Sequence, residues 1–177
     1  MEQSECLAEL GQLFIEVNQL DEAEEATMHS ISLLGKGQEF QLCDSNRVLG
    51  HAYLSKGEKG KAIHHYSIAL GIADTFNWHD QLFWTHESLA KLFREEGEFE
   101  NAHAHIKKAK ELAVDNKYFL GRAMDGCALT LYRQGRCAEA ASEALGAIEI
   151  YRELGAANDL ESCKDFLRRI EQSMKKP

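Results

Sequence analysis

The sequence has almost no proline. Its single proline is Pro177, the last of 177 residues. An interior proline removes a backbone hydrogen-bond donor and breaks a helix, so its absence leaves long uninterrupted helices open along the whole chain. Ala, Leu, Glu and Lys are plentiful and favour helix. These features predict a mostly helical protein.

The sequence also lacks basic character, long apolar runs and paired cysteine motifs. Its net charge is −9, and nucleic-acid binding draws on clustered Lys and Arg, so we expect no nucleic-acid partner. No apolar run approaches the ~20 residues of a membrane span, and the start MEQSECLAEL lacks the pattern of a secretory signal, so we expect no membrane partner. The five scattered cysteines form no C-x-x-C motif and indicate free thiols in a reducing cytoplasm.

Four similar stretches recur along the chain, at 9–23, 48–62, 88–102 and 126–140. Each carries apolar residues at steps of three and four, then a turn residue, then a small residue. The turn residues are Asn18, Gly57, Gly97 and Gly135, at spacings of 39, 40 and 38. Asn and Gly tolerate the left-handed conformation that ends a helix, so each repeat is predicted to be a pair of helices.

Small residues recur on one face of each predicted second helix. They are Ala62 and Ala69, Ala102 and Ala109, and Ala140 and Ala147, and Gly50, Ala90 and Ala128 have the same role on the first helices. Such residues allow two helices to approach closely. Asp80, Asp115, Asn116 and Asn158 are expected to be N-caps of the helices that follow the repeat junctions.

The final segment, 157–174, places Leu160, Cys163, Phe166, Leu167 and Ile170 on one face and charges on the other. This pattern predicts a helix that caps the array. The expected fold is therefore all-α, an α-solenoid of four helix pairs plus a C-terminal capping helix, nine helices in all. It forms a single domain over 1–177, with repeats at about 3–36, 38–76, 79–115 and 117–154.

The repeat resembles the tetratricopeptide repeat. The residues that carry the resemblance most closely are Asn46, Leu49, Gly50, Tyr53, Gly57, Ala62, Tyr66, Ala69 and Leu70. The period near 40, against ~34 in the family, and the missing helix-closing proline are similar to the long-helix variety found in kinesin light chains and LGN-type adaptors. The closing stretch from Arg152 also resembles the repeat tails of fungal NOD-like STAND ATPases. The resemblance implies a right-handed superhelix whose first helices line a concave groove for a peptide or a partner helix.

Matching the first helices to the motif predicts the residues that face this groove. They are Glu5, Gln12 and Glu16; Asp44, Arg47, His51 and Ser55; Trp84, Glu87, Lys91, Arg94 and Glu95; and Arg122, Asp125, Leu129, Tyr132 and Arg133. Chaperone-binding members carry Lys and Asn of a carboxylate clamp where this chain has Ala8 and Gln12. Capture of a chaperone's C-terminal carboxylate is therefore not expected.

The predicted groove gathers basic side chains, and guanidinium groups bind carboxylates well. The hypothesis is an acidic or amphipathic helical ligand, held by these charges and by Trp84 and Tyr132 as apolar anchors. The alternative is that the basic residues pair with Glu87, Glu95 and Asp125 and select nothing, because exposed ion pairs are weak.

The sequence predicts no catalytic residue, cofactor site or metal site. GEKGKA, at 57–62, departs from the phosphate-loop pattern because Ala62 replaces the hydroxyl that would hold magnesium. The pairs His64–His65 and His103–His105 lack the three- or four-residue spacing of ligands on one helical face. Cys127 replaces a core leucine and is expected to be buried and inert.

The aromatic run FNWHDQLFW, at 76–84, supports two interpretations. It packs between repeats as core, or it forms an exposed anchor patch. Trp84 is the residue expected to be exposed, because the motif places it on the groove side.

The leading function is a non-catalytic protein-interaction scaffold. The alternative is a sensor or autoinhibitory repeat arm of a larger STAND-type signalling ATPase, and an enzyme comes third. No strong N-cap precedes Leu7 and no polar element caps the first repeat. The chain is therefore expected to be a fragment or to self-associate through its N-terminal repeat.

Overall fold

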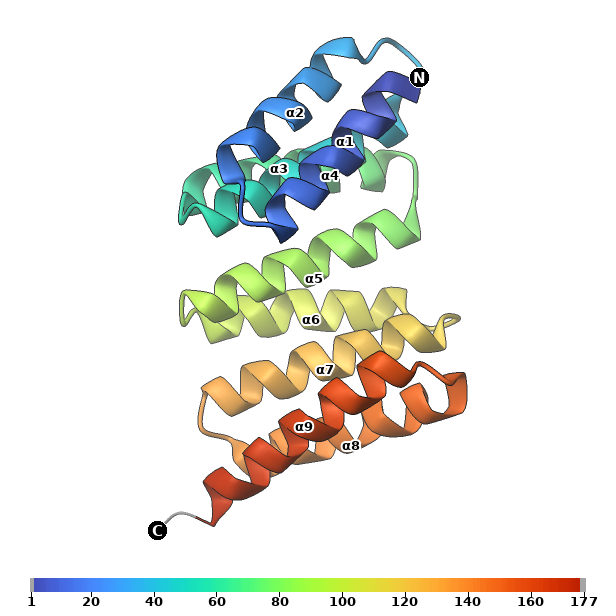
Figure 1. Ribbon diagram of the computed structural model, residues 1–177. Helices are drawn as coiled ribbons and strands as arrows, with labels where there is room; N and C mark the ends of the chain where they lie inside the picture. Colours follow the sequence, from blue (N-terminus) through green and yellow to red (C-terminus); the bar gives the residue numbers. More distant parts are fainter. Residues whose placement is uncertain (1, 176–177) are drawn as a thin grey trace. The chain divides into compact units, whose positions relative to one another are not determined.

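The computed structural model describes residues 2–175 of the chain. Over these residues the protein consists of nine α-helices and contains no strand (Figure 1). The helices are α1 (Glu2–Glu16), α2 (Leu20–Leu33), α3 (Glu39–Ser55), α4 (Lys59–Thr75), α5 (His79–Glu95), α6 (Phe99–Leu112), α7 (Lys117–Arg133), α8 (Cys137–Leu154) and α9 (Ala157–Met174). The predicted all-α solenoid is confirmed.

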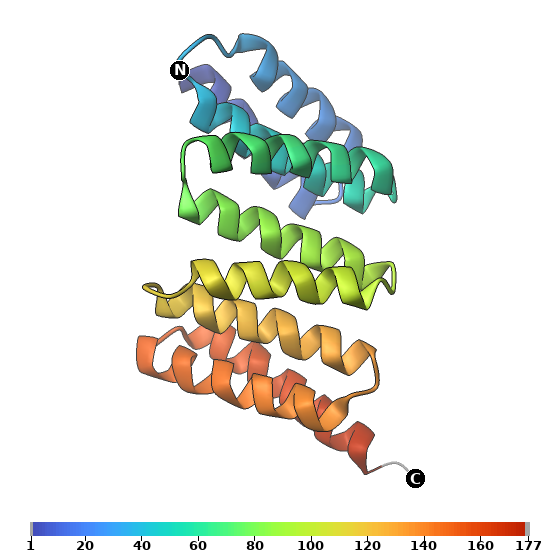
Figure 2. The ribbon, with the colours of Figure 1, turned by 180° about the vertical axis from the view of Figure 1, so that it is seen from behind.

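The chain divides into two compact units, Met1–Ser88 and Leu89–Pro177, and the boundary falls inside α5. In the first unit α1 packs on α2, α3 packs on α4, and α3 contacts both helices of the first pair. In the second unit α6 contacts α7, α7 pairs with α8, and α9 packs on α8, as the two views show (Figures 1 and 2). Each predicted repeat range holds one helix pair, and the prediction of one domain over 1–177 stays a prediction.

The turns between paired helices share one backbone geometry. Asn18, Gly57, Gly97 and Gly135 all have positive φ, between 61° and 79°. After each of them, an amide bonds the carbonyl five residues earlier at 2.8–2.9 Å, as from Glu58 to Tyr53. These are the bonds of a Schellman helix end, which needs a residue that tolerates left-handed φ. The predicted turns are confirmed.

The predicted N-caps are correct at only one of four positions. Asn116 caps α7, and its Oδ1 accepts a hydrogen bond from the amide of Phe119 at 3.1 Å. Asp80 and Asn158 lie within the first turns of α5 and α9, and Asp115 precedes the cap. A carboxylate in a first turn still favours the helix through its dipole, which explains Asp80 at that position.

Paired helices are held close by residues with little or no side chain. The six alanines predicted for this role are 0–1% exposed. Gly50 of α3 lies directly under the ring of Tyr66 of α4, and a Cβ there would overlap the ring. In the second unit, the same function belongs to Gly121 of α7, where a Cβ would lie 3.0 Å from Tyr151.

None of the described helices is long and apolar enough to cross a membrane.

Replacing Gly50 with alanine tests the close packing of α3 against α4. Because the new methyl group would overlap Tyr66, we expect Gly50→Ala to lower the free energy of unfolding by about 1–3 kcal/mol. Gly71→Ala is the matched control: Gly71 lies in the neighbouring helix α4 and a Cβ there meets open space, so the variant should gain up to about 1 kcal/mol. Denaturant unfolding followed by circular dichroism measures both, and equal midpoints for the two variants would contradict the packing.

Candidate functional site

A groove opens between α1 and α3 of the first unit. Its volume is about 450 Å³. Its lining residues recur at helical spacing, so each helix presents one face to it. They are Ala8, Glu9, Gln12 and Leu13 of α1 and Asp44, Arg47, Val48 and His51 of α3. A second hollow of about 240 Å³ shares Ala8, Glu9 and Asp44 with the groove and extends it toward Phe40.

Arg47 forms the centre of the polar wall of this groove. One of its terminal nitrogens, Nη2, donates to Oδ1 of Asp44 at 2.6 Å, and the other, Nη1, lies 3.3 Å from Nε2 of His51. All three residues project from α3 at steps of three and four. The guanidinium charge is therefore largely compensated by Asp44 before any ligand binds.

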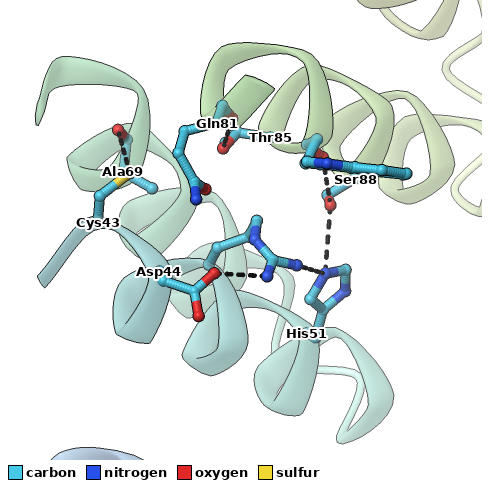
Figure 3. A network of polar contacts seen from close by, with 9 residues as sticks. Cys43, Asp44, His51, Ala69, Gln81, Thr85 and Ser88 are labelled. Carbon is cyan, nitrogen blue, oxygen red and sulfur yellow. Dashed lines mark hydrogen bonds and ion pairs between the residues drawn. The ribbon is translucent and has the colours of Figure 1, made fainter. Parts of the chain in front are cut away.

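His51 connects the groove to the helices behind it. Its Nδ1 lies 3.1 Å from the hydroxyl of Tyr66, and its Nε2 lies 3.3 Å from Oγ of Ser88, as Figure 3 shows for the contact with Ser88. An arginine can only donate, so in its contact with Arg47 the Nε2 atom of His51 is the acceptor. His51 thus joins Arg47 on the groove wall to Tyr66 and Ser88 behind it.

Two buried polar atoms beside this network have no hydrogen-bond partner among the described residues. They are Nε of Arg47 and Oε1 of Gln81, whose side chain points from α5 toward α3 (Figure 3). A buried donor or acceptor without a partner costs about 1–3 kcal/mol. This wall of the groove is therefore not arranged for maximal stability of the unbound protein.

The floor and rim of the groove differ in polarity. Leu13 is 56% exposed, whereas Ala8 and Val48 are buried beside it. Around this apolar strip, the described lining residues include three carboxylates, Glu5, Glu9 and Asp44, and one arginine, Arg47. The groove of the first unit is thus apolar at its base and acidic overall.

The sequence prediction and the structure agree on part of this site. The structure brings the predicted residues Gln12, Asp44, Arg47 and His51 together. The prediction missed Glu9, Leu13 and Val48, and took Ala8 only as a departure from a clamp. Leu13 follows Gln12 directly, and an apolar residue adjacent to a predicted groove position was the available signal.

In the aromatic run at 76–84, Phe76 is more exposed than Trp84. Phe83 is fully buried, Trp84 is half-buried against it at 5.2 Å between ring centroids, and Phe76 is 47% exposed. Trp78 stacks on Phe76 at 4.7 Å and meets Phe40 edge-on at 5.2 Å. Trp84 is thus partly exposed, and its role as a groove-side anchor stays a prediction.

In the second unit, several predicted groove residues of α7 contact α9. Nη1 of Arg122 lies 4.0 Å from a carboxylate oxygen of Asp159, and the hydroxyl of Tyr118 donates to the other oxygen at 3.5 Å. The ring of Tyr132 meets Phe166 edge-on at 5.4 Å, and its hydroxyl lies 2.9 Å from Oγ of Ser173. These side chains hold the capping helix.

The remaining predicted groove residues vary in exposure. Leu129 packs against the apolar core of the second unit. Glu87 and Arg94 are half-buried, and Lys91 and Arg133 are exposed. Whether any of them contacts a ligand stays a prediction.

Asp125 is a half-buried carboxylate of α7 beside Cys163 of α9. Burial raises its pKa, an effect only partly offset by the positive charges of Arg122 and Arg94. Burial and the negative charge of Asp125 raise the pKa of the Cys163 thiol to about 12.

The buried cysteine and histidine side chains elsewhere are not activated for catalysis. Burial raises the pKa of the Cys43 and Cys127 thiols to about 11, so both remain protonated at neutral pH. His65 stacks on Tyr53 at 5.3 Å and His105 on Phe93 at 5.5 Å, and burial lowers the pKa of both histidines. Among the described residues, no three His, Cys, Asp or Glu side chains gather in a way that could hold a metal ion.

Comparison with solved structures finds a fold neighbour. The crystal structure of BtubC (BKLC) from P. vanneervenii matches with a TM-score of 0.70 and 19% sequence identity, over 98% of this chain and 81% of that one. At this identity the match shows the fold, a helical repeat. No protein-family model matches the chain, and no curated protein matches it.

Replacing Asp125 with asparagine tests whether burial destabilises the ionised carboxylate. A raised pKa means that the folded state holds this proton more tightly than the unfolded state, so ionisation costs stability above the folded pKa. We expect Asp125→Asn to raise the free energy of unfolding at neutral pH, and the gain to vanish as pH falls below the ordinary Asp value near 3.8.

Denaturant unfolding at both pH values measures the difference. Glu149→Gln, at an exposed position of α8, is the matched control for the loss of one negative charge. A neutral-pH gain no larger than that of this control would show that Asp125 is not destabilised by burial.

Proposed function

We propose that this protein is a non-catalytic protein-interaction scaffold of the long-helix tetratricopeptide type. Its first unit binds an amphipathic peptide or helical segment in the groove between α1 and α3. The observation that carries the proposal is the composition of that groove, in which exposed Leu13 adjoins a strip of Ala8 and Val48 with polar side chains on both sides. Such a surface suits a ligand with one apolar and one polar face.

The apolar strip supplies the binding energy in this proposal. Covering the exposed part of Leu13 contributes about 1 kcal/mol. The two unpartnered atoms, on Arg47 and Gln81, add support, because functional sites commonly depart from the arrangement that is best for stability. A small side-chain shift on binding can restore their hydrogen bonds.

The charges of the groove refine the choice of ligand. An acidic segment would meet Glu5 and Glu9, while Arg47 is already compensated by Asp44. We therefore assign to the first unit a ligand with basic residues beside its apolar face. The preference for an acidic ligand is proposed only for the second unit, where Lys91 and Arg133 are exposed.

The inert side chains favour binding over catalysis. The thiols of Cys43, Cys127 and Cys163 are buried and protonated, and the groove is open to water. Acid–base and nucleophilic chemistry needs activated groups in a closed site. A repeat arm of a signalling ATPase and a cytoplasmic location remain predictions from the sequence.

The test is selection of binding peptides from a phage-displayed random library. Peptides enriched in apolar and basic residues are expected. Leu13→Glu should weaken the affinity of a selected synthetic peptide at least about tenfold, because it places a charge on the apolar strip. The matched control is Leu145→Glu, since Leu145 of α8 is 53% exposed and lies in the other unit.

Fluorescence polarisation measures both affinities, with circular dichroism to check folding. Selected peptides that bind Leu13→Glu as tightly as the wild type would overturn the groove as the site. Failure to select any peptide would overturn the proposed ligand class.

A further inference from the structure

Gln81 of α5 is a buried polar side chain aimed at the helix that forms one wall of the groove. It is 8% exposed, and its Oε1 atom has no hydrogen-bond partner among the described residues. Its backbone is anchored, because its carbonyl accepts a hydrogen bond from Oγ1 of Thr85 at 2.7 Å. The side chain points toward the face of α3 that carries Asp44 and His51 (Figure 3). An acceptor kept in this way destabilises the unbound protein, and an incoming donor relieves that cost.

Arg47 provides an unused donor on the same face of α3. Its Nη2 donates to Asp44 and its Nη1 to His51, whereas its buried Nε has no partner among the described residues. The guanidinium group is planar and rigid, so these two bonds also fix the direction of the Nε–H bond. His51 is itself held by Tyr66 and Ser88. The donor is therefore oriented before any ligand binds.

The two atoms together select one kind of ligand group. A carboxylate only accepts and an ammonium or guanidinium group only donates, so each would leave one of the two atoms unpaired. A backbone amide is also unsuitable, because a trans peptide bond directs its C=O and N–H to opposite sides. A side-chain carboxamide carries an acceptor oxygen and a donor nitrogen at the same end. It can accept from Nε of Arg47 and donate to Oε1 of Gln81.

We propose that Arg47 and Gln81 form a subsite for an asparagine or glutamine side chain of the ligand. This subsite rests on the proposed binding of a peptide in the groove, whose wall includes Arg47. Both atoms are buried in the unbound protein, so the Gln81 side chain rotates as the carboxamide enters. A ligand without the carboxamide would leave the buried donor and acceptor unpaired, which is how sites of this kind reject close analogues.

Gln81→Met is the variant that removes the acceptor. Methionine has nearly the same length and shape, and the change eliminates a buried oxygen without a partner, so we expect the variant to fold at least as stably as the wild type. Gln172→Met is the matched control, because Gln172 is an exposed residue of α9 in the second unit. Circular dichroism checks that both variants fold.

A double-mutant cycle between protein and peptide tests the proposal. The phage-displayed library is expected to yield peptides with asparagine or glutamine enriched at one position beside the apolar residues. Replacing that residue with an apolar one of similar shape, leucine for asparagine or methionine for glutamine, should weaken binding to the wild type at least about tenfold. The same replacement should cost Gln81→Met at least about threefold less affinity, because the acceptor is already gone. Fluorescence polarisation measures the four affinities.

The cycle separates the subsite from the groove. A loss of affinity that is equal in the wild type and in Gln81→Met would overturn the subsite, as would selected peptides enriched in serine, threonine or acidic residues but not in asparagine or glutamine. Gln172→Met should show the same loss as the wild type. If Leu13→Glu weakens binding while Gln81→Met shows no coupling to the peptide, the groove stands and the subsite falls.

A small probe decides the question if the library yields no peptide. Nuclear magnetic resonance of isotope-labelled protein reports the side-chain N–H groups of Arg47 and Gln81 directly. Titration with propionamide should shift both signals, whereas propionate and propylammonium at the same concentration should not, since neither ion can pair with both atoms. Signals that respond equally to all three probes, or to none of them, would then overturn the proposal.

Discussion

The close approach of paired helices is the constraint on which the rest of the structure depends. At the α3–α4 pair it is made by Gly50, over which the ring of Tyr66 lies. The same contact places the Tyr66 hydroxyl 3.1 Å from His51, the next residue along α3. His51 in turn meets Arg47 on the groove wall. A glycine that serves packing therefore also sets the position of polar side chains that a ligand would meet.

The last helix shows how apolar surface is covered in such a repeat. A helix pair leaves apolar surface exposed until a neighbouring element covers it. In the second unit α9 covers this surface, and Tyr132, Arg122 and Asp125 of α7 face it. In the first unit Leu7 and Leu33 line a hollow between α1 and α2.

The sequence predicted which residues share a helical face better than it predicted which element packs against that face. The structure places the predicted residues Gln12, Arg47 and His51 in the lining of one groove, since helical spacing decides which residues of a helix share a face. The same motif matching assigned Arg122 and Tyr132 of α7 to a ligand, and in the structure both side chains contact α9. A helical face does not reveal which element occupies it.

The sequence by itself determined the nine helices, the turns at Asn18, Gly57, Gly97 and Gly135, and the small residues of the pairs. These features are local: a positive φ or an absent side chain acts within one turn of helix. Only the tertiary structure decided that Gln81 lacks a partner and that the first groove is acidic. Those outcomes depend on which side chains of separate helices come together, and a distance between helices is not written in the spacing of residues along one of them.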